Sequence, residues 1–504
     1  MDIKGDIFDG IYEPGDDGIP EFKFFIKGEW KSSDSFYEIS SPIDGRAIAR
    51  VSKPTKEQLE SSIETIDRKG KEKIREYPGE KRVESFLKAA DLIEENFEDF
   101  LNVSILDAGK TKENAEGEVK ATIKRLRRTT MEMRSFLGDF IPGDWSEETL
   151  ESEGIIQREP FGVVLAISPF NYPLFISATK VTPAILSGNA TILKPPSSDP
   201  LTALLFTRVL ESSGIPPQSL ATVTTKGRDM SPLIEEGRIR GITFTGSTEV
   251  GSKIIKQAGI KSFHMELGGN DPALVLSDAD LETTAEKIVS GITSYSGQRC
   301  DGIRMVLPVE SIYEPLKNEL VDRLEDITPQ NPLEDENAKM GPLIDKKSAK
   351  YVEEIHRDAV ENGAKPLLEF KREENYVSPT LLEADKQDLE DIRGFGEEVF
   401  GPFSLLIKVE TPKEGIKIAN STKFGLDASV FGQDETEIRK IAKDLEVGAV
   451  FVNEYPRHGI GYYPFGGMKC SGIGREGVGY SINQLTTTKT IVHNFKGTGV
   501  WDYT

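Results

Sequence analysis

Cys300 closes the stretch YSGQRC at residues 295–300 and is one of only two cysteines in the 504 residues. A thiolate can attack a carbonyl carbon and carry a covalent intermediate. A free cysteine is more often a small buried hydrophobe, and catalytic use needs a neighbour that favours the thiolate. Arg299 precedes the thiol, and its positive charge is expected to favour the thiolate. Taken alone, the stretch leaves both interpretations open.

Glu266 is a candidate general base. It stands between Met265 and Leu267 in MELGGNDP, residues 265–272. An apolar setting raises the pKa of a carboxyl group toward the range that suits a base. Gly268 and Gly269 follow and permit a close approach of the backbone. The alternative is a carboxylate paired with a nearby cation.

Asn171 lies in SPFNYPL, residues 168–174, directly after the apolar run VVLAI. Two prolines predict a rigid loop at the carboxyl end of a strand, where ligands bind in open parallel sheets. The amide of Asn171 could donate a hydrogen bond there. The alternative is a polar loop residue that satisfies its own backbone.

A fourth stretch, FTGSTEVG at residues 244–251, predicts a strand that ends at Gly246 and a helix that begins at Glu249. Ser247 and Thr248 can cap that helix, and its N-terminus would suit a pyrophosphate. The stretch is not a G-x-G-x-x-G motif, so an ordinary capped turn is the alternative.

Alternating short apolar runs and amphipathic segments must position these residues. They predict a parallel sheet with helices on both faces, followed by a second α/β domain with a boundary at NDP, residues 270–272. Residues 54–140 are predicted to be helical, and the C-terminal TTTKTIVHNF suits an edge strand. The first series of strands is expected at 163–167, 190–194, 221–225 and 242–246, with helices from Pro173, Asp199 and Asp229, and the second series at 273–278, 304–309, 403–409, 427–432 and 448–453.

The composition limits the partners. A net charge of −22 disfavours nucleic acid and anionic membranes, and an anionic substrate would need a local cluster of arginine or lysine. Two cysteines cannot form a disulfide framework, no apolar run approaches 18 residues, and the first residues lack a signal-peptide pattern, so the cytoplasm is expected. The four histidines show no metal-ligand spacing, and no metal is expected.

Three further stretches complete an ordered set: LKPPSSDPLTAL (193–204), EEVFGPF (397–403) and PFGGMKCSGIGREG (464–477). Together the seven stretches resemble the aldehyde dehydrogenase superfamily from about residue 20 to the C-terminus. The resemblance implies an α/β fold with a Rossmann-like cofactor-binding domain at 1–140 and 160–270 and a catalytic domain at 271–480. It also implies an oligomerisation arm at 141–159 and 481–504, and a homotetramer.

The same resemblance assigns roles to residues. Cys300 would be the nucleophile, and Asn171 with the Cys300 backbone N–H would form the oxyanion hole. Glu266 would activate the water that hydrolyses a thioester. The implied cofactor site consists of Glu398 and Phe400 at the nicotinamide ribose and ring, and Lys194, Gly246 and Ser247 at the adenosine ribose and pyrophosphate.

The cofactor is expected to be NADP, with NAD as the alternative. NAD-preferring members of the superfamily commonly carry Glu three residues after the lysine, whereas Ser197 follows Lys194 here. A carboxylate would repel a 2′-phosphate, and a hydroxyl can donate to it.

Tyr172, Arg299, Arg457 and the tail FKGTGVWDYT resemble the non-phosphorylating glyceraldehyde-3-phosphate dehydrogenases, in which a tyrosine and arginines hold the substrate phosphate. A further arginine is expected in EVKATIKRLRRTT, with Arg125 chosen over its neighbours. The prediction is oxidation of glyceraldehyde 3-phosphate to 3-phosphoglycerate with NADP. The alternative substrate is glyceraldehyde, lactaldehyde or a semialdehyde. The alternative class of protein is a non-catalytic relative that serves in binding or structure. For Arg457, the alternative to a phosphate contact is a surface ion pair.

Overall fold

A computed structural model describes residues 3–459 and 461–495. Its first large sheet has five parallel strands at its centre, each a short run of mostly buried residues. Such runs are expected when helices cover both faces of a sheet. In spatial order the strands are β23 (Gly472–Ile473), β13 (Ser262–Glu266), β12 (Gly241–Thr245), β9 (Val163–Ile167), β10 (Ala190–Lys194), β11 (Leu220–Thr222), β3 (Phe24–Ile26) and β4 (Glu29–Lys31).

The predicted helices appear around this sheet, with one difference. The helix expected near Asp229 is the short α9 (Ser231–Ile234), whereas α7 (Pro173–Leu186), α8 (Leu201–Ser213) and α10 (Thr248–Ala258) are long. The predicted helical region ends at Met133 and is followed by a strand. It consists of α1 (Lys56–Thr65), α2 (Lys71–Glu76), α3 (Gly79–Glu95), α4 (Phe97–Ala108), α5 (Lys112–Leu126) and α6 (Thr129–Met133).

The sequence predicts no elements for residues 1–53, yet all four strands of a small sheet lie there. Its order is β1 (Tyr12–Pro14), β2 (Pro20–Phe22), β6 (Ala47–Ser52) and β5 (Phe36–Ser40). Strands of this length, with mixed burial, carry little periodic signal.

The second large sheet begins at Asp271, five residues after the first sheet's β13 ends. Its order is β16 (Lys365–Pro366), β19 (Thr380–Glu383), β20 (Phe403–Leu406), β15 (Ile303–Pro308), β14 (Asp271–Val275), β21 (Asp427–Phe431) and β22 (Ala449–Val452). Its helices are α11 (Leu281–Thr293), α12 (Glu310–Glu325), α13 (Lys346–Glu361), α14 (Arg393–Gly396), α15 (Pro412–Ser421) and α16 (Glu435–Asp444). The predicted domain boundaries stay predictions. The short β23, from the predicted catalytic domain, pairs with β13 of the first sheet.

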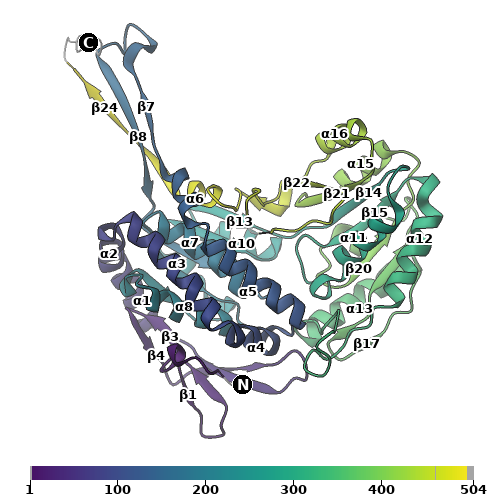
Figure 1. The fold of residues 1–504 in the computed structure, drawn as a ribbon, viewed down its shortest axis with the longest axis horizontal. Coiled ribbons are helices and arrows are strands. Elements are labelled where there is room, and N and C mark those ends of the chain that lie inside the picture. Colours follow the sequence, from purple (N-terminus) through teal and green to yellow (C-terminus); the bar gives the residue numbers. More distant parts are fainter. Residues whose placement is uncertain (1–2, 460, 496–504) are drawn as a thin grey trace.

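An arm extends away from the two lobes (Figure 1). It is a three-stranded sheet of β7 (Asp139–Ile141), β8 (Ser152–Pro160) and β24 (Thr486–Asn494). The short α17 (Tyr480–Gln484) directly precedes β24 in the chain. β24 runs antiparallel to β8 over its whole length, from Thr486 opposite Pro160 to Asn494 opposite Ser152. The predicted arm continues from residue 496 outside the described residues.

Among residues 3–459 and 461–495, no helix combines the length and apolar character that crossing a membrane requires.

Candidate active site

A cavity of about 910 Å³ is lined by residues of both lobes. Six of the residues singled out in the sequence contribute to its wall: Cys300, Glu266, Asn171, Tyr172, Arg299 and Arg457. They come from stretches that are far apart in the chain. The fold therefore places a thiol, a carboxylate and an amide around one space.

The backbone before Cys300 is strained. Tyr295, Ser296 and Gly297 are successive residues with φ of 49°, 55° and 70°. The left-handed conformation costs a residue with a Cβ roughly 1–2 kcal/mol. The Tyr295 hydroxyl donates to the backbone oxygen of Ala108 at 2.9 Å, and Ser296 donates to another backbone carbonyl at 2.8 Å. These contacts hold the turn that carries the thiol.

Asn171 is buried and lies against this turn. Its Nδ2 donates to the backbone oxygen of Gln298 at 3.1 Å, and its Oδ1 accepts from the Tyr172 N–H at 3.1 Å. A side-chain amide has two N–H donors. One of them remains for a substrate oxygen.

A buried ion pair holds the Asn171 loop. Lys110 pairs with Glu118 of α5, and both side chains are fully buried. Glu118 Oε1 also accepts from the first N–H groups of α7, at Leu174 and Phe175, at 3.0 Å each. The Lys110 ammonium lies 4.3 Å from the centre of the Tyr172 ring. Nothing in the sequence distinguished this pair from the many surface charges.

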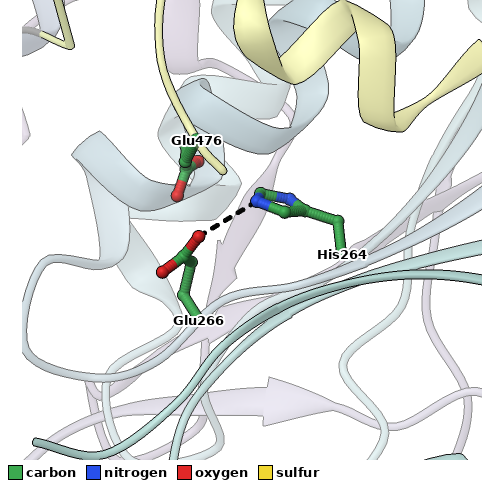
Figure 2. A group of neighbouring side chains, drawn as sticks. All are labelled: His264, Glu266 and Glu476. Carbon is green, nitrogen blue, oxygen red and sulfur yellow. Dashed lines mark hydrogen bonds and ion pairs between the residues drawn. The ribbon is translucent and has the colours of Figure 1, made fainter. Parts of the chain in front are cut away.

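Glu266 ends β13 inside a cluster of charged side chains (Figure 2). Its Oε1 lies 3.1 Å from His264 Nε2, and its Oε2 has no hydrogen-bond partner within the described part of the chain. Burial, followed by the charge of Glu476, raises the pKa of Glu266 well above its usual range. A buried carboxyl group with one free oxygen on the cavity wall is placed as a general base requires.

The atoms of His264, Glu266 and Glu476 lie close enough together to hold a metal ion. The histidine spacing gave no hint of this group, because Glu476 is distant in the sequence. The ammonium of Lys180 lies 3.7 Å from Glu476 Oε2, and both side chains are buried. This lysine already supplies the positive charge that a cation would bring.

The expected effect of Arg299 on the thiol stays a prediction, because its positive charge is paired with a carboxylate. Its Nη2 donates to Asp301 Oδ2 at 2.9 Å and to the backbone oxygen of Pro456 at 2.7 Å. Burial, and after it the charge of Asp301, raise the pKa of Cys300 well above its usual range. Both effects favour the neutral thiol over the thiolate.

Arg125 does not line the cavity, so its predicted contact with the substrate is corrected. Its guanidinium is buried and donates to both oxygens of Glu132 at 2.7 and 2.8 Å. α5 instead presents Lys120 and Lys124 to the cavity. Helical periodicity alone did not decide which basic residue of this segment faces the space.

Arg457 fits both interpretations given to it. It lines the cavity, 57% of its side chain is exposed, and its Nη2 lies 3.1 Å from Glu454 Oε2. Such an exposed pair is weak, so its guanidinium remains available to an anion.

The predicted adenosine-ribose residues lie where two strands end. Lys194 ends β10 and is buried, and its Nζ donates to Ser197 Oγ at 3.2 Å. Burial lowers the pKa of Lys194 to about 8. Ser247 caps α10 by accepting from the Val250 N–H at 3.4 Å, directly after Gly246.

Glu398 and Phe400 lie near the other predicted cofactor segment. Glu398 Oε1 accepts from the Gly269 N–H at 3.2 Å, and the Phe400 ring meets Phe170 edge-on at 5.5 Å. A Cβ on Gly268 would lie 2.4 Å from the Glu398 carboxylate, so a larger residue there would displace this side chain. Two buried hydroxyls, of Thr245 at the end of β12 and of Thr225 in the loop after β11, have no partner in the described chain. The Glu398 carboxylate and these two hydroxyls are groups that can form hydrogen bonds with a dinucleotide.

The pattern of the aldehyde dehydrogenase family matches residues 30–491. The chain belongs to the aldehyde dehydrogenase family. It is 37% identical to an NADP-dependent glyceraldehyde-3-phosphate dehydrogenase of Streptococcus equinus over 94% of the chain and 98% of that protein. It is 33% identical to a lactaldehyde dehydrogenase of Methanococcus maripaludis over 93% of the chain and 100% of that protein.

Among solved structures, the aldehyde dehydrogenase fold of this chain is similar to an NADP-dependent glyceraldehyde-3-phosphate dehydrogenase from Bacillus halodurans in complex with NADP. The TM-score is 0.89 at 35% identity, over 94% of this chain and 99% of that one. The predicted α/β fold class and the resemblance to the family are confirmed. This aldehyde dehydrogenase is therefore an enzyme that oxidises aldehydes.

Proposed function

We propose that this aldehyde dehydrogenase oxidises glyceraldehyde 3-phosphate to 3-phosphoglycerate with NADP, through a thioester on Cys300 that water hydrolyses. The observation that carries the proposal is the single cavity shared by Cys300, Asn171 and Glu266, with Tyr172, Arg299 and Arg457 on its wall. The first three supply the chemistry, and the others supply donors for a phosphate.

The chemistry assigned to the protein uses three groups. Cys300 Sγ attacks the aldehyde carbon, and the free N–H of Asn171 donates to the oxygen on which charge develops. The reactive form of Cys300 is the thiolate, which has given its proton to solvent. Glu266 Oε2, which is buried and unpartnered among the described residues, is the candidate base for the water that hydrolyses the thioester.

The cofactor assignment rests on Lys194, Ser197 and the capped α10. NADP, when bound, supplies the hydride acceptor. Lys194 would offer its ammonium to the 2′-phosphate and Ser197 its hydroxyl, and no carboxylate stands at position 197 to repel it. NADP-linked relatives at 37% and 35% identity support this choice.

An uncharged 2-hydroxyaldehyde such as lactaldehyde or glyceraldehyde is the second candidate substrate. Asp301 adjoins the nucleophile, lines the cavity and binds Arg299. A phosphate near Arg299 would face this carboxylate, whereas a hydroxyl could donate to it. The relative named as a lactaldehyde dehydrogenase also supports this candidate.

A panel of these aldehydes, each with NADP and NAD, tests the proposal. Glyceraldehyde 3-phosphate should exceed glyceraldehyde in kcat/KM by about ten- to a hundredfold, the effect of one charge-assisted hydrogen bond. Arg457→Leu should remove that advantage and leave glyceraldehyde nearly unchanged. Equal or better turnover of glyceraldehyde by the unmodified enzyme would favour the second candidate.

A further inference from the structure

His264 and Glu266 project from the same face of β13, because alternate residues of a strand share a face. His264 Nε2 lies 3.1 Å from Glu266 Oε1 (Figure 2). The other ring nitrogen, Nδ1, lies 3.0 Å from the hydroxyl oxygen of Thr243, which is opposite His264 on β12. Lys180 Nζ lies 3.4 Å from that same hydroxyl oxygen. The four side chains form a continuous chain of contacts.

The chemistry of lysine fixes the direction of these hydrogen bonds. An ammonium group donates and has no acceptor, so Thr243 Oγ1 accepts from Lys180. The hydroxyl proton of Thr243 then has one acceptor among the described residues, His264 Nδ1. Nδ1 is therefore unprotonated, and the neutral imidazole carries its proton on Nε2. That proton is donated to Glu266 Oε1.

The surrounding charges agree with a neutral imidazole. Burial, and after it the charge of Lys180, lower the pKa of His264 to about 4. Glu476 and His458 face it from the C-terminal segment. The groups that act on Glu266 are Glu476, Lys180, Arg475 and Asp427.

We propose that His264 is a positioning residue for hydrolysis of the thioester: it holds Glu266 Oε1 by donating from Nε2 and leaves Oε2 free to take a proton. The inference rests on the proposed role of Glu266 as the base. In this step the oxygen of water bonds to the acyl carbon and one water proton passes to Oε2. The carbon–sulfur bond breaks, its electron pair returns to Cys300 Sγ, and the acid leaves.

Loss of the Nε2 donor should shift the pKa of Glu266 in a defined direction. The donor stabilises the ionised carboxylate of Glu266, so its removal raises the pKa of Glu266 further. The base is then ionised only at higher pH. Attack of the thiol on the aldehyde uses Cys300 and Asn171, which do not contact His264, and should be spared.

Two variants of similar polarity separate positioning from packing. In His264→Gln the side-chain amide can still donate to Glu266, whereas in His264→Asn the shorter amide can replace only the contact with Thr243. The acyl-enzyme is formed with glyceraldehyde 3-phosphate and NADP, and its decay is followed by intact-protein mass spectrometry between pH 5.5 and 9. The burst of NADPH and the thermal midpoint report whether each variant is folded and acylates.

His264→Asn should hydrolyse the acyl-enzyme about ten- to a hundredfold more slowly at neutral pH, the effect of one hydrogen bond to a charged group. In His264→Asn the acid limb of the pH profile for acyl-enzyme hydrolysis should move to higher pH, and the burst of NADPH should be normal. His264→Gln should recover most of the rate of hydrolysis. Unchanged decay and pH profile in His264→Asn would overturn the proposal. Equal losses in both variants would also overturn it, because they indicate packing alone.

Glu266→Gln serves as the control for the proposed function. It should acylate and then stall. If it hydrolyses the acyl-enzyme normally, the assignment of Glu266 as the base fails whatever His264 does. If it stalls while His264→Asn behaves as the unmodified enzyme, the inference about His264 fails alone.

Discussion

Asp301 governs the charge next to the nucleophile. It binds Arg299 at 2.9 Å, and its charge, after burial, raises the pKa of Cys300. Asp301→Asn should lower the thiol pKa, and each pKa unit is a tenfold change in the thiolate fraction. Alkylation of Cys300 by iodoacetamide at pH 7.5 should therefore accelerate several-fold.

The alkylation experiment needs a Cys470→Ser background, because Cys470 is exposed and would react as well. The rate should be followed against pH in both proteins. A pH–rate curve that does not move in Asp301→Asn would show that the charge of Asp301 does not act on the thiol.

The lowered pKa of Lys194 leads us to expect that cofactor binding depends on pH. Burial lowers its pKa to about 8, so in the free enzyme the ammonium is present below pH 8 and is lost as the pH rises through that value. NADP affinity should be constant below about pH 7 and should weaken by up to tenfold per pH unit above about 8. Fluorescence titrations at several pH values measure this Kd.

Lys194→Met is the matched control, and its weaker Kd should not change over the same range. NAD, which lacks the 2′-phosphate, should show a smaller dependence in the unmodified enzyme. A flat profile for NADP in the unmodified enzyme would place the 2′-phosphate away from Lys194.

At the scale of elements, the Lys110–Glu118 pair connects α5 to the start of α7. Lys110→Met leaves a buried carboxylate without its cation, a change that typically costs about 3–5 kcal/mol. The midpoint of urea unfolding should fall, and kcat should fall with it, because the Asn171 loop precedes α7. Urea unfolding together with steady-state kinetics measures both effects.

Lys120→Met on the same helix is the comparison. Lys120 pairs with Glu116 at the surface, so its removal should change the unfolding midpoint little. If Lys110→Met is as stable as Lys120→Met, the buried pair does not hold the loop.

The sequence predicted those elements whose signal is local. The buried strands of both sheets and the capped α10 follow from continuous apolar runs and capping residues. The charged cluster around Glu266 was missed, because Lys180 and Glu476 come from segments distant from β13, and the contact of His264 with Glu266 depends on the strand that places both on one face. Asp301 was visible beside Cys300, but its bond to Arg299 depends on the turn that follows the left-handed Tyr295 and Ser296.

At the scale of the whole molecule, the arm carries apolar side chains that the single chain leaves exposed. Phe140 is 59% exposed and Val492 is 65% exposed. Exposed apolar patches commonly mark interfaces, and the predicted homotetramer would cover them. Val492→Asp combined with Phe140→Asp should reduce the mass measured by light scattering after size exclusion.

Ile260→Asp is the control for the arm, because Ile260 is fully exposed elsewhere on the surface. It should leave the mass unchanged. An unmodified enzyme that is already monomeric, or arm variants with unaltered mass, would contradict the predicted role of the arm.

The central claim is that an aldehyde is oxidised on Cys300 and released by water, without phosphate as the acyl acceptor. The most direct measurement mixes Glu266→Gln with glyceraldehyde 3-phosphate and NADP in buffer free of inorganic phosphate, followed by intact-mass analysis and peptide mapping. The account predicts one NADPH and one phosphoglyceroyl group per chain, attached to Cys300. An unmodified Cys300 during full turnover, or an acyl group located on Cys470, would contradict it.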